Sequence, residues 1–192
     1  MGVTYSSYLK LKELLELQQP LSDGPEHDET LFIIIHQVYE LWFKEMLHEL
    51  DFVKVLLERG DAPRALHTMK RVLTILKVVV AQIDVLETMT PLEFLSFRAR
   101  LESGSGFQSF QFRELEALLG LKDERALARY PEGSDARERI ERRLAAPTLW
   151  DAFLHYLVSQ GRDVPKELLQ RDVTKSIEPA PALHPVLIDC YR

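Results

Sequence analysis

The amino-acid sequence predicts an all-α protein, and three observations support this fold class. No segment shows the sustained alternation of polar and apolar residues that is typical of half-buried strands. After Gly2, the glycines lie between stretches in which apolar residues recur every three or four positions. Pro63, Pro91, Pro147 and Pro165 stand near the starts of such stretches, where a missing backbone N–H is tolerated. We therefore expect a helical bundle that is built around two long antiparallel helices.

The first long helix is expected from about Asp28 to Arg59, and Gly60 follows as its C-terminal stop. Its main apolar residues form one stripe at three- and four-residue steps: Phe32, Ile35, Tyr39, Trp42, Met46, Leu50, Val53 and Leu57. Further apolar residues surround its first half: Ile33, Ile34, Val38 and Leu41. We therefore expect this first half to be buried on most sides.

The second long helix is expected from about Pro63 to Thr88 and should pack antiparallel against the first. Its inner face is expected to carry the following residues or their neighbours: Leu66, Met69, Leu73, Leu76, Val80, Ile83 and Leu86. A shorter helix follows Thr90 and runs to about Leu101, because Thr90 and Glu93 have the spacing of a capping box. Further helices are expected at 108–119, 134–145 and 148–160. The residues from Pro185 onward resemble the opening of another apolar helix, so we expect the sequence to be a piece of a longer protein.

Composition predicts one soluble domain over residues 1–192. The chain has 192 residues, of which 46% are hydrophobic and 28% charged. A formal net charge of −6 opposes binding to nucleic-acid phosphates, so no nucleic-acid partner is expected. The longest apolar runs are too short or too charged for a membrane span, and the first residues lack the features of a signal peptide. Because Cys190 is the only cysteine, no internal disulfide forms, and we expect a cytoplasmic protein.

His36 is the first candidate for chemistry, because it follows the apolar run 31–35 and lies one helical turn after Phe32. An imidazole in such surroundings can donate or accept a hydrogen bond, or exchange a proton. The same pattern is also typical of a structural histidine, such as one that is bonded to Glu40.

Arg98 is the second candidate, because it lies one turn after Phe94 and its planar guanidinium suits a carboxylate ligand. An internally paired or solvated arginine explains the pattern equally well. Residues 103–107 include Gly104 and Gly106, which would let the backbone approach a ligand closely or simply form a turn between helices.

A metal site was also considered, because Glu45 and His48 have the Glu-x-x-His spacing that occurs in di-iron helical bundles. Such sites need a second element of this kind and two further glutamates, and no second Glu-x-x-His occurs. The sequence therefore gives no support for this metal site.

Several segments resemble the tryptophan 2,3-dioxygenase family. They are residues 5–9 (YSSYL), 27–44 (HDETLFIIIHQVYELWFK), 86–91 (LETMTP), 94–98 (FLSFR), 105–113 (SGFQSFQFR) and 149–154 (LWDAFL). The segments follow one another along nearly the whole chain. The resemblance implies an all-α fold, haem b, a homotetramer, and the insertion of O2 across the indole C2–C3 bond of L-tryptophan to give N-formylkynurenine.

The resemblance also implies roles for individual residues. His36 matches the distal histidine that meets the indole N–H, and Arg98 matches the partner of the substrate carboxylate. Phe32 and Phe94 match walls of the indole pocket, and we count Ile33, Ile34 and Ile35 among the substrate-binding residues. Ser105 and Gly106 match the loop against the distal haem face. The N-terminal segment 1–20 is expected to pack on a neighbouring subunit, with Tyr5, Tyr8 and Leu9 reaching into that subunit's pocket.

One part of the family's pattern does not occur in this sequence. The family's proximal haem histidine and its glycine- and serine-rich ammonium-binding loop lie C-terminal to everything present here, and neither His155 nor His184 lies in a matching motif. We therefore assign no metal ligand in this chain. Two alternatives stay open, namely a haem-free helical binding or oligomerisation module and a related haem dioxygenase that acts on another indole.

Overall fold

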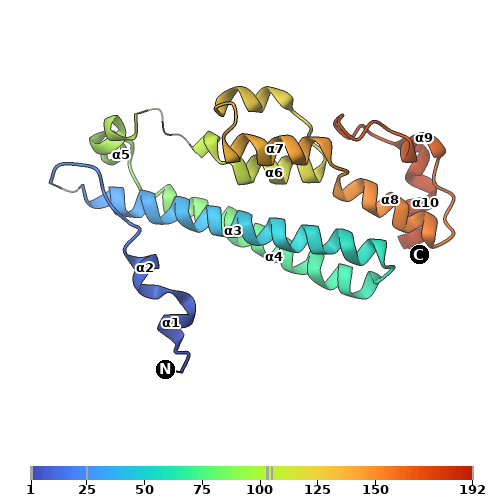
Figure 1. Cartoon of the computed structure of the whole chain (residues 1–192), viewed down its shortest axis with the longest axis horizontal. Coiled ribbons are helices and arrows are strands. Elements are labelled where there is room, and N and C mark those ends of the chain that lie inside the picture. Colours follow the sequence, from blue (N-terminus) through green and yellow to red (C-terminus); the bar gives the residue numbers. More distant parts are fainter. Residues whose placement is uncertain (1, 25, 103, 105, 192) are drawn as a thin grey trace. The chain divides into compact units, whose positions relative to one another are not determined.

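The computed structural model describes residues 2–24, 26–102, 104 and 106–191, and helices connected by loops make up this part of the chain (Figure 1). The α-helices are α1 (Tyr5–Leu9), α2 (Leu11–Leu15), α3 (His27–Glu58), α4 (Ala62–Leu86), α5 (Pro91–Arg98), α6 (Phe110–Leu119), α7 (Asp135–Ala145), α8 (Leu149–Ser159), α9 (Lys166–Leu169) and α10 (His184–Tyr191). The 3₁₀ helices are η1 (Ala99–Leu101), η2 (Gly106–Gln108), η3 (Glu124–Arg129) and η4 (Pro181–Leu183). The all-α class that the sequence predicts is confirmed.

The chain divides into two compact units. The first unit comprises residues 1–41 and 78–106, and the second comprises residues 42–77 and 107–192. Both long helices, α3 and α4, contribute one part to each unit. The single domain expected from composition therefore stays a prediction.

The helix boundaries agree with the local signals in the sequence. Helix α3 ends at Glu58, and Gly60 follows with a φ of 73°, a left-handed conformation that glycine adopts without strain. Helix α5 begins after Thr90, whose hydroxyl accepts a hydrogen bond from the Glu93 N–H at 3.3 Å. In return the Glu93 carboxylate accepts one from the Thr90 N–H at 2.6 Å. The expected capping box is confirmed.

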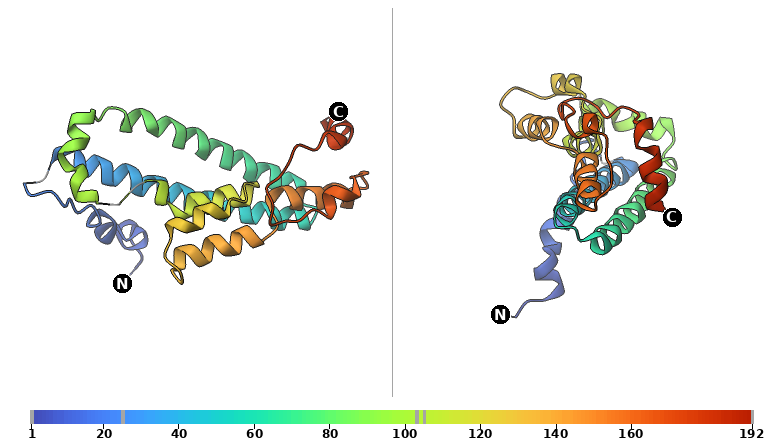
Figure 2. Two further views of the ribbon diagram at one scale, coloured as in Figure 1. Left: turned by 90° about the horizontal axis from the view of Figure 1, so that it is seen from above. Right: turned by 90° about the vertical axis from the view of Figure 1, so that its right-hand side faces the viewer.

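In the second unit α3 and α4 form an antiparallel pair. Near the turn between the helices, Val53 and Leu57 of α3 share a buried cluster with Ala65 of α4. Farther from the turn, Arg71 of α4 donates a hydrogen bond to the Glu49 carboxylate of α3 at 2.6 Å. The contacts thus follow in opposite order along the two helices. In the same unit α6 and α7 lie side by side (Figure 2) over a second cluster, which includes Ala117, Tyr130, Ile140 and Leu144.

One expectation about burial is confirmed only for the neighbours of the named residues, and another is wrong. The buried face of α4 carries Ala65, Thr68, Val72 and Ile75, whereas the predicted inner residues Leu66, Leu73, Leu76, Val80 and Ile83 are 59, 53, 39, 64 and 45% exposed. Helix α4 thus has two apolar stripes one residue apart, and Ala65 of the buried stripe packs with Val53 and Leu57 of α3. The first half of α3 is also more open than expected, since Ile34 and Leu41 are 43 and 52% exposed. Across residues 27–41 only Glu29 and Ile35 are buried.

Within the described ranges, no helix is both long enough and apolar enough to span a bilayer.

Candidate functional site

Three phenylalanines of the first unit pack together and form the base of the candidate site. The Phe32 ring lies 5.7 Å from the Phe94 ring and 5.5 Å from the Phe97 ring, measured between centroids. Phe94 and Phe97 meet edge-to-face at 5.5 Å, and Phe97 is fully buried. This cluster fastens α5 to the first half of α3 and places Phe32 and Phe94 beside each other. Their role as walls of an indole pocket stays a prediction.

His36 stacks next to this cluster in one defined tautomer. Its ring centroid lies 4.1 Å from that of Phe32, and its Nδ1 is 2.7 Å from the Phe32 carbonyl oxygen. Because a carbonyl can only accept a hydrogen bond, Nδ1 must carry the proton. In a neutral imidazole the opposite nitrogen, Nε2, is then left with a free lone pair. The hydrogen bond from Nδ1 to the Phe32 carbonyl, rather than a bond to Glu40, orients the ring.

Gly106 lies against the free nitrogen of His36. A Cβ atom added at Gly106 would lie 3.7 Å from Nε2 of His36 and 3.9 Å from its Cδ2. This is an ordinary van der Waals distance, so the backbone at Gly106 lies directly beside the edge of the imidazole that carries Nε2. Ser105, the other predicted residue of this loop, lies outside the described residues.

Arg98 ends α5 one turn after Phe94 and is only partly buried. Its Nη1 donates a hydrogen bond to the Glu102 carbonyl oxygen at 3.1 Å. Glu102 has a φ of 47° and a ψ of −116°, a backbone conformation that non-glycine residues rarely adopt. One carbonyl uses one of the five guanidinium donors, so the group retains donors for a carboxylate. Its convergence with His36 on one substrate stays a prediction.

Of the three isoleucines before His36, only Ile33 lies on the same side of α3 as His36, because successive helix residues point about 100° apart. Ile35 is 5% exposed and belongs to the core, whereas Ile34 lies on the opposite side of α3 from His36 and is 43% exposed. Ile33 is partly buried. Their assignment to the substrate pocket stays a prediction.

The N-terminal residues that were expected to reach a neighbouring subunit are open to solvent in this chain. Tyr5, Tyr8 and Leu9 are 74, 76 and 41% exposed, and α1 and α2 contain no buried residue. Lys10, with a left-handed φ of 53°, separates the two short helices. The structure thus leaves these side chains free to contact another molecule, and their role there stays a prediction.

A metal site at Glu45 and His48 finds no further ligand. Within the described ranges no three His, Cys, Asp or Glu side chains are grouped closely enough to hold a metal ion. His48 is exposed on the surface of α3.

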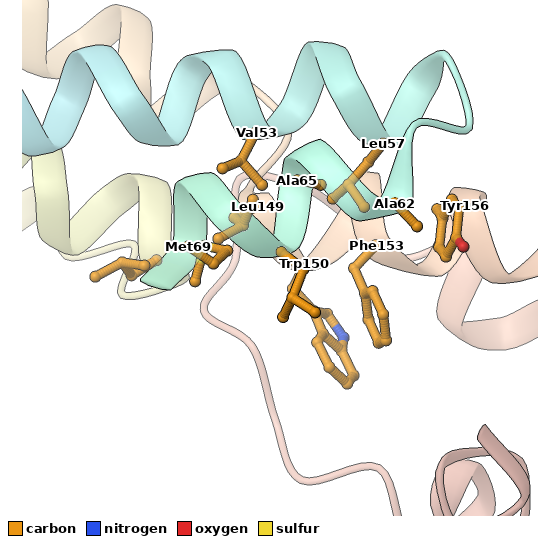
Figure 3. A pocket seen from close by; sticks show the side chains of 11 residues that line it. Val53, Leu57, Ala62, Ala65, Met69, Leu149, Trp150, Phe153 and Tyr156 are labelled. Carbon is orange, nitrogen blue, oxygen red and sulfur yellow. The ribbon is translucent and has the colours of Figure 1, made fainter. Parts of the chain in front are cut away.

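The second unit contains an apolar pocket that the sequence analysis missed. Its volume is about 420 Å³, and α3, α4 and α8 supply most of its wall (Figure 3). Trp150 and Phe153 of α8 project along one side of it, and Met69 of α4 lies on another. The i, i+3 spacing of Trp150 and Phe153 was the available sequence signal. The lining offers apolar surface and the Tyr156 phenol, without a carboxylate, imidazole or amine.

The sequence analysis also missed the roles of two residues near His36. Phe97 is the most deeply buried member of the aromatic cluster, and its i, i+3 spacing from Phe94 was the signal. Glu29 is 1% exposed, although an acidic residue in the first turn of a helix is ordinarily a surface group that complements the helix dipole.

Comparison with known proteins identifies the family of this chain. The profile of the tryptophan 2,3-dioxygenase family matches residues 1–157. A tryptophan 2,3-dioxygenase of Herpetosiphon aurantiacus is 56% identical over 191 residues, which are 100% of this chain and 73% of the relative. Relatives of the same name from Anaeromyxobacter sp. strain K and Caulobacter vibrioides are 54 and 44% identical, over 100 and 99% of this chain and 71 and 72% of their own length. The chain therefore belongs to the tryptophan 2,3-dioxygenase family.

Proposed function

We propose that this chain supplies the distal side of the active site of a haem-dependent tryptophan 2,3-dioxygenase. The reaction inserts both atoms of O2 across the indole C2–C3 bond of L-tryptophan and yields N-formylkynurenine, a step of tryptophan catabolism by the kynurenine pathway. Family membership supports the reaction class. The observation that carries the site is the His36 ring, which is held by the Phe32 carbonyl so that Nε2 faces Gly106.

The residues around Gly106 fit the distal face of haem b. A planar macrocycle needs close backbone approach and an apolar surround, and both Gly106 and the partly buried Phe32 supply these features. When bound, haem supplies the iron at which O2 is activated. The first unit contains His27 and His36, and His27 is exposed at the start of α3. We therefore assign the distal face to this chain, and we assign no axial ligand among the histidines of the first unit.

The proposed role of His36 follows from its tautomer. The unprotonated Nε2 can accept a hydrogen bond from the indole N–H, because the Phe32 carbonyl already binds the proton on Nδ1. Phe32 and Phe94, whose ring centroids are 5.7 Å apart and therefore in contact, would form one continuous aromatic wall beside the indole. The imidazole therefore orients the substrate and can receive its N–H proton.

Arg98 would bind the substrate carboxylate through two parallel charge-assisted hydrogen bonds. In the present structure the guanidinium contacts the Glu102 carbonyl, so substrate binding would exchange a neutral acceptor for an anionic one. Holding the amino-acid end fixes the indole ring relative to His36. Indole without the amino-acid group should therefore be a poor substrate.

The proposed assembly is a cytoplasmic homotetramer in which the N-terminal arm of one subunit contacts its neighbour. The exposed apolar side chains Tyr5, Tyr8 and Leu9 support this, because α1 and α2 bury no residue within their own chain.

Haem absorbance and tryptophan turnover by the purified protein test this proposal. We expect His36→Ala to retain haem and to lower the rate of N-formylkynurenine formation. His155→Ala is the control, because His155 is exposed on α8 in the second unit. Unchanged turnover in His36→Ala would make His36 a structural residue. Failure of the wild-type protein to bind haem and oxidise tryptophan would instead favour a haem-free binding module.

A further inference from the structure

Glu29 is a buried carboxylate on the same side of α3 as His36, two turns earlier in the helix. It is 1% exposed, whereas an uncompensated carboxylate in such a position would be costly. Glu29 and His36 are seven residues apart, so their side chains project in nearly the same direction. None of the roles proposed above for the substrate site uses Glu29.

The segment that joins the N-terminal arm to α3 supplies the hydrogen bonds that compensate the buried charge of Glu29. One carboxylate oxygen of Glu29 accepts a hydrogen bond from the Leu21 N–H at 2.7 Å, and the other accepts one from the Ser22 N–H at 3.1 Å. The Ser22 hydroxyl donates a third hydrogen bond to the second oxygen. The Ser22 oxygen also accepts a hydrogen bond from the Glu26 N–H at 3.0 Å, which fixes its orientation. Three donors from two consecutive residues thus surround one buried charge.

A second contact holds the same segment beside His36. The Gln18 side chain donates to the Gln37 amide oxygen at 2.6 Å, and the Gln37 amide nitrogen donates to the Leu17 carbonyl at 3.2 Å. Gln37 directly follows His36 in α3. Residues 17–22, which we call the connector, are therefore fixed to α3 at two points, one on each side of the Phe32–His36 turn.

The N-terminal arm, residues 5–15, depends on this connector for its position. Helices α1 and α2 contain no buried residue, so their own apolar contacts do not hold them to the chain. The connector and the first turn of α3 are thus the place at which the arm's direction is set.

We infer that Glu29 is a positioning residue that fixes the connector to the His36-bearing part of α3 and so directs the N-terminal arm. The inference rests on the proposed function only where it concerns tryptophan, since the connector contacts exist in the chain by themselves. If the arm completes a neighbouring pocket, loosening the connector should weaken tryptophan binding without altering the chemistry at His36.

Glu29→Gln is the test variant, because it keeps the shape and removes the charge, and its amide N–H₂ group must face a backbone donor. We expect hydrogen exchange at the connector amides to rise by about tenfold or more, as for loss of a buried charge-assisted network. Asp23→Asn is the matched control on the neighbouring loop, since Asp23 forms an ion pair with Arg100 while remaining 90% exposed. It should raise exchange by about fivefold or less. Equal effects of the two variants, or unchanged exchange in Glu29→Gln, would overturn the inference.

Turnover kinetics test the link from the connector to the substrate. Glu29→Gln should raise KM for L-tryptophan by about threefold or more with kcat within about twofold, because it acts on binding alone. In a protein that already carries Tyr5→Ser and Tyr8→Ser, Glu29→Gln should raise KM for L-tryptophan little further, because residues that act through the same element are not additive. A full KM effect in that background would show that Glu29 acts independently of the arm and would overturn its role in positioning it. If the wild-type protein does not oxidise tryptophan, the proposed function fails, while the exchange experiment still decides whether Glu29 holds the connector.

Discussion

The first unit, residues 1–41 and 78–106, and the second unit, residues 42–77 and 107–192, are stabilised in different ways. Among the described residues of the first unit, only Ile35 and Phe97 are buried apolar residues. The second unit has several apolar clusters, with Leu50, Leu56 and Leu154 each 1% exposed. The candidate site therefore lies in the less densely packed unit. Low local stability is typical of segments that rearrange when a ligand binds.

The second unit also contains an ion pair that is more deeply buried than the Arg100–Asp23 pair of the first unit. In the second unit Arg171 pairs with Asp151 at 2.6 Å, and their side chains are only 16 and 8% exposed. In the first unit Arg100 pairs with Asp23 at 2.8 Å, but these side chains are 51 and 90% exposed. Because exposed pairs contribute little free energy, the hydrogen-bonded Glu29 carboxylate should stabilise the first unit more than the Arg100–Asp23 pair. This comparison shows that one buried carboxylate can fix a segment where apolar contacts are few.

The largest predicted effect concerns the apolar core of the second unit. Leu154→Ala should lower the free energy of unfolding by about 2–5 kcal/mol, because it leaves a cavity among fully buried side chains. Leu95→Ala is the control in the first unit, where Leu95 is 62% exposed and should cost about 0.5 kcal/mol or less. Urea denaturation measures both. Equal losses would contradict the difference in packing between the units.

The same capping motif occurs in both units and should stabilise them unequally. Thr148 is fully buried, and its hydroxyl donates to Asp151 at 2.7 Å, whereas Thr90 is exposed at the start of α5. Thr148→Ala should lower the free energy of unfolding by about 2 kcal/mol, because the buried Asp151 carboxylate and N–H lose the Thr148 hydroxyl as their partner. Thr90→Ala should cost about 0.5 kcal/mol. Thermal denaturation of the two variants checks this order, and a larger loss for Thr90→Ala would reverse it.

Arg98→Lys tests whether the first unit carries substrate recognition. We expect kcat/KM for L-tryptophan to fall by more than about tenfold, because an ammonium group cannot form the parallel pair of hydrogen bonds that a guanidinium forms with a carboxylate. Arg125→Lys in the second unit is the matched control, since the Arg125 side chain is 91% exposed. Steady-state kinetics on both variants give the comparison. An unchanged value for Arg98→Lys would remove Arg98 from the site.

The smallest effect concerns a buried cation of the second unit. The Lys122 ammonium donates to the carbonyls of Arg143 and Ala146 at 2.6 and 2.7 Å, at the end of α7. Burial, followed by the nearby Arg171 charge, lowers the pKa of Lys122 from 10.5 to about 8. Between these values the unfolded chain holds a proton that the folded chain has released, so stability should rise with pH.

Lys122→Met should abolish that rise between about pH 8 and 10.5. At pH 7 it should cost about 1 kcal/mol, because two lost hydrogen bonds are partly offset by removal of a buried charge. Lys166→Met, at an exposed lysine of α9, should retain the rise. Melting temperatures measured across this pH range decide the matter, and a rise that persists in Lys122→Met would assign it to other groups.

Local signals in the sequence were sufficient to predict the longer helices and to place two residues of the candidate site on one helix face. Thr90 with Glu93, and Gly60 after α3, mark helix ends because the interactions that form them lie within a few residues. The i, i+4 spacing of Phe32 and His36 likewise places them on one face of α3. That spacing did not predict which nitrogen of His36 is free, since this depends on the bond to the Phe32 carbonyl.

Other features depended on contacts between residues that are distant in the sequence. Helix α4 carries two apolar stripes with the same period. The stripe with Ala65, which shares a cluster with α3, is buried, whereas the stripe with Leu66 and Leu73 is exposed. Glu29 has the sequence signature of a surface residue that complements a helix dipole, yet the connector covers it. Periodicity reports how residues are distributed around one helix. Which face becomes buried depends on the shape and the hydrogen-bonding groups of the neighbouring segment, and these meet only in the folded chain.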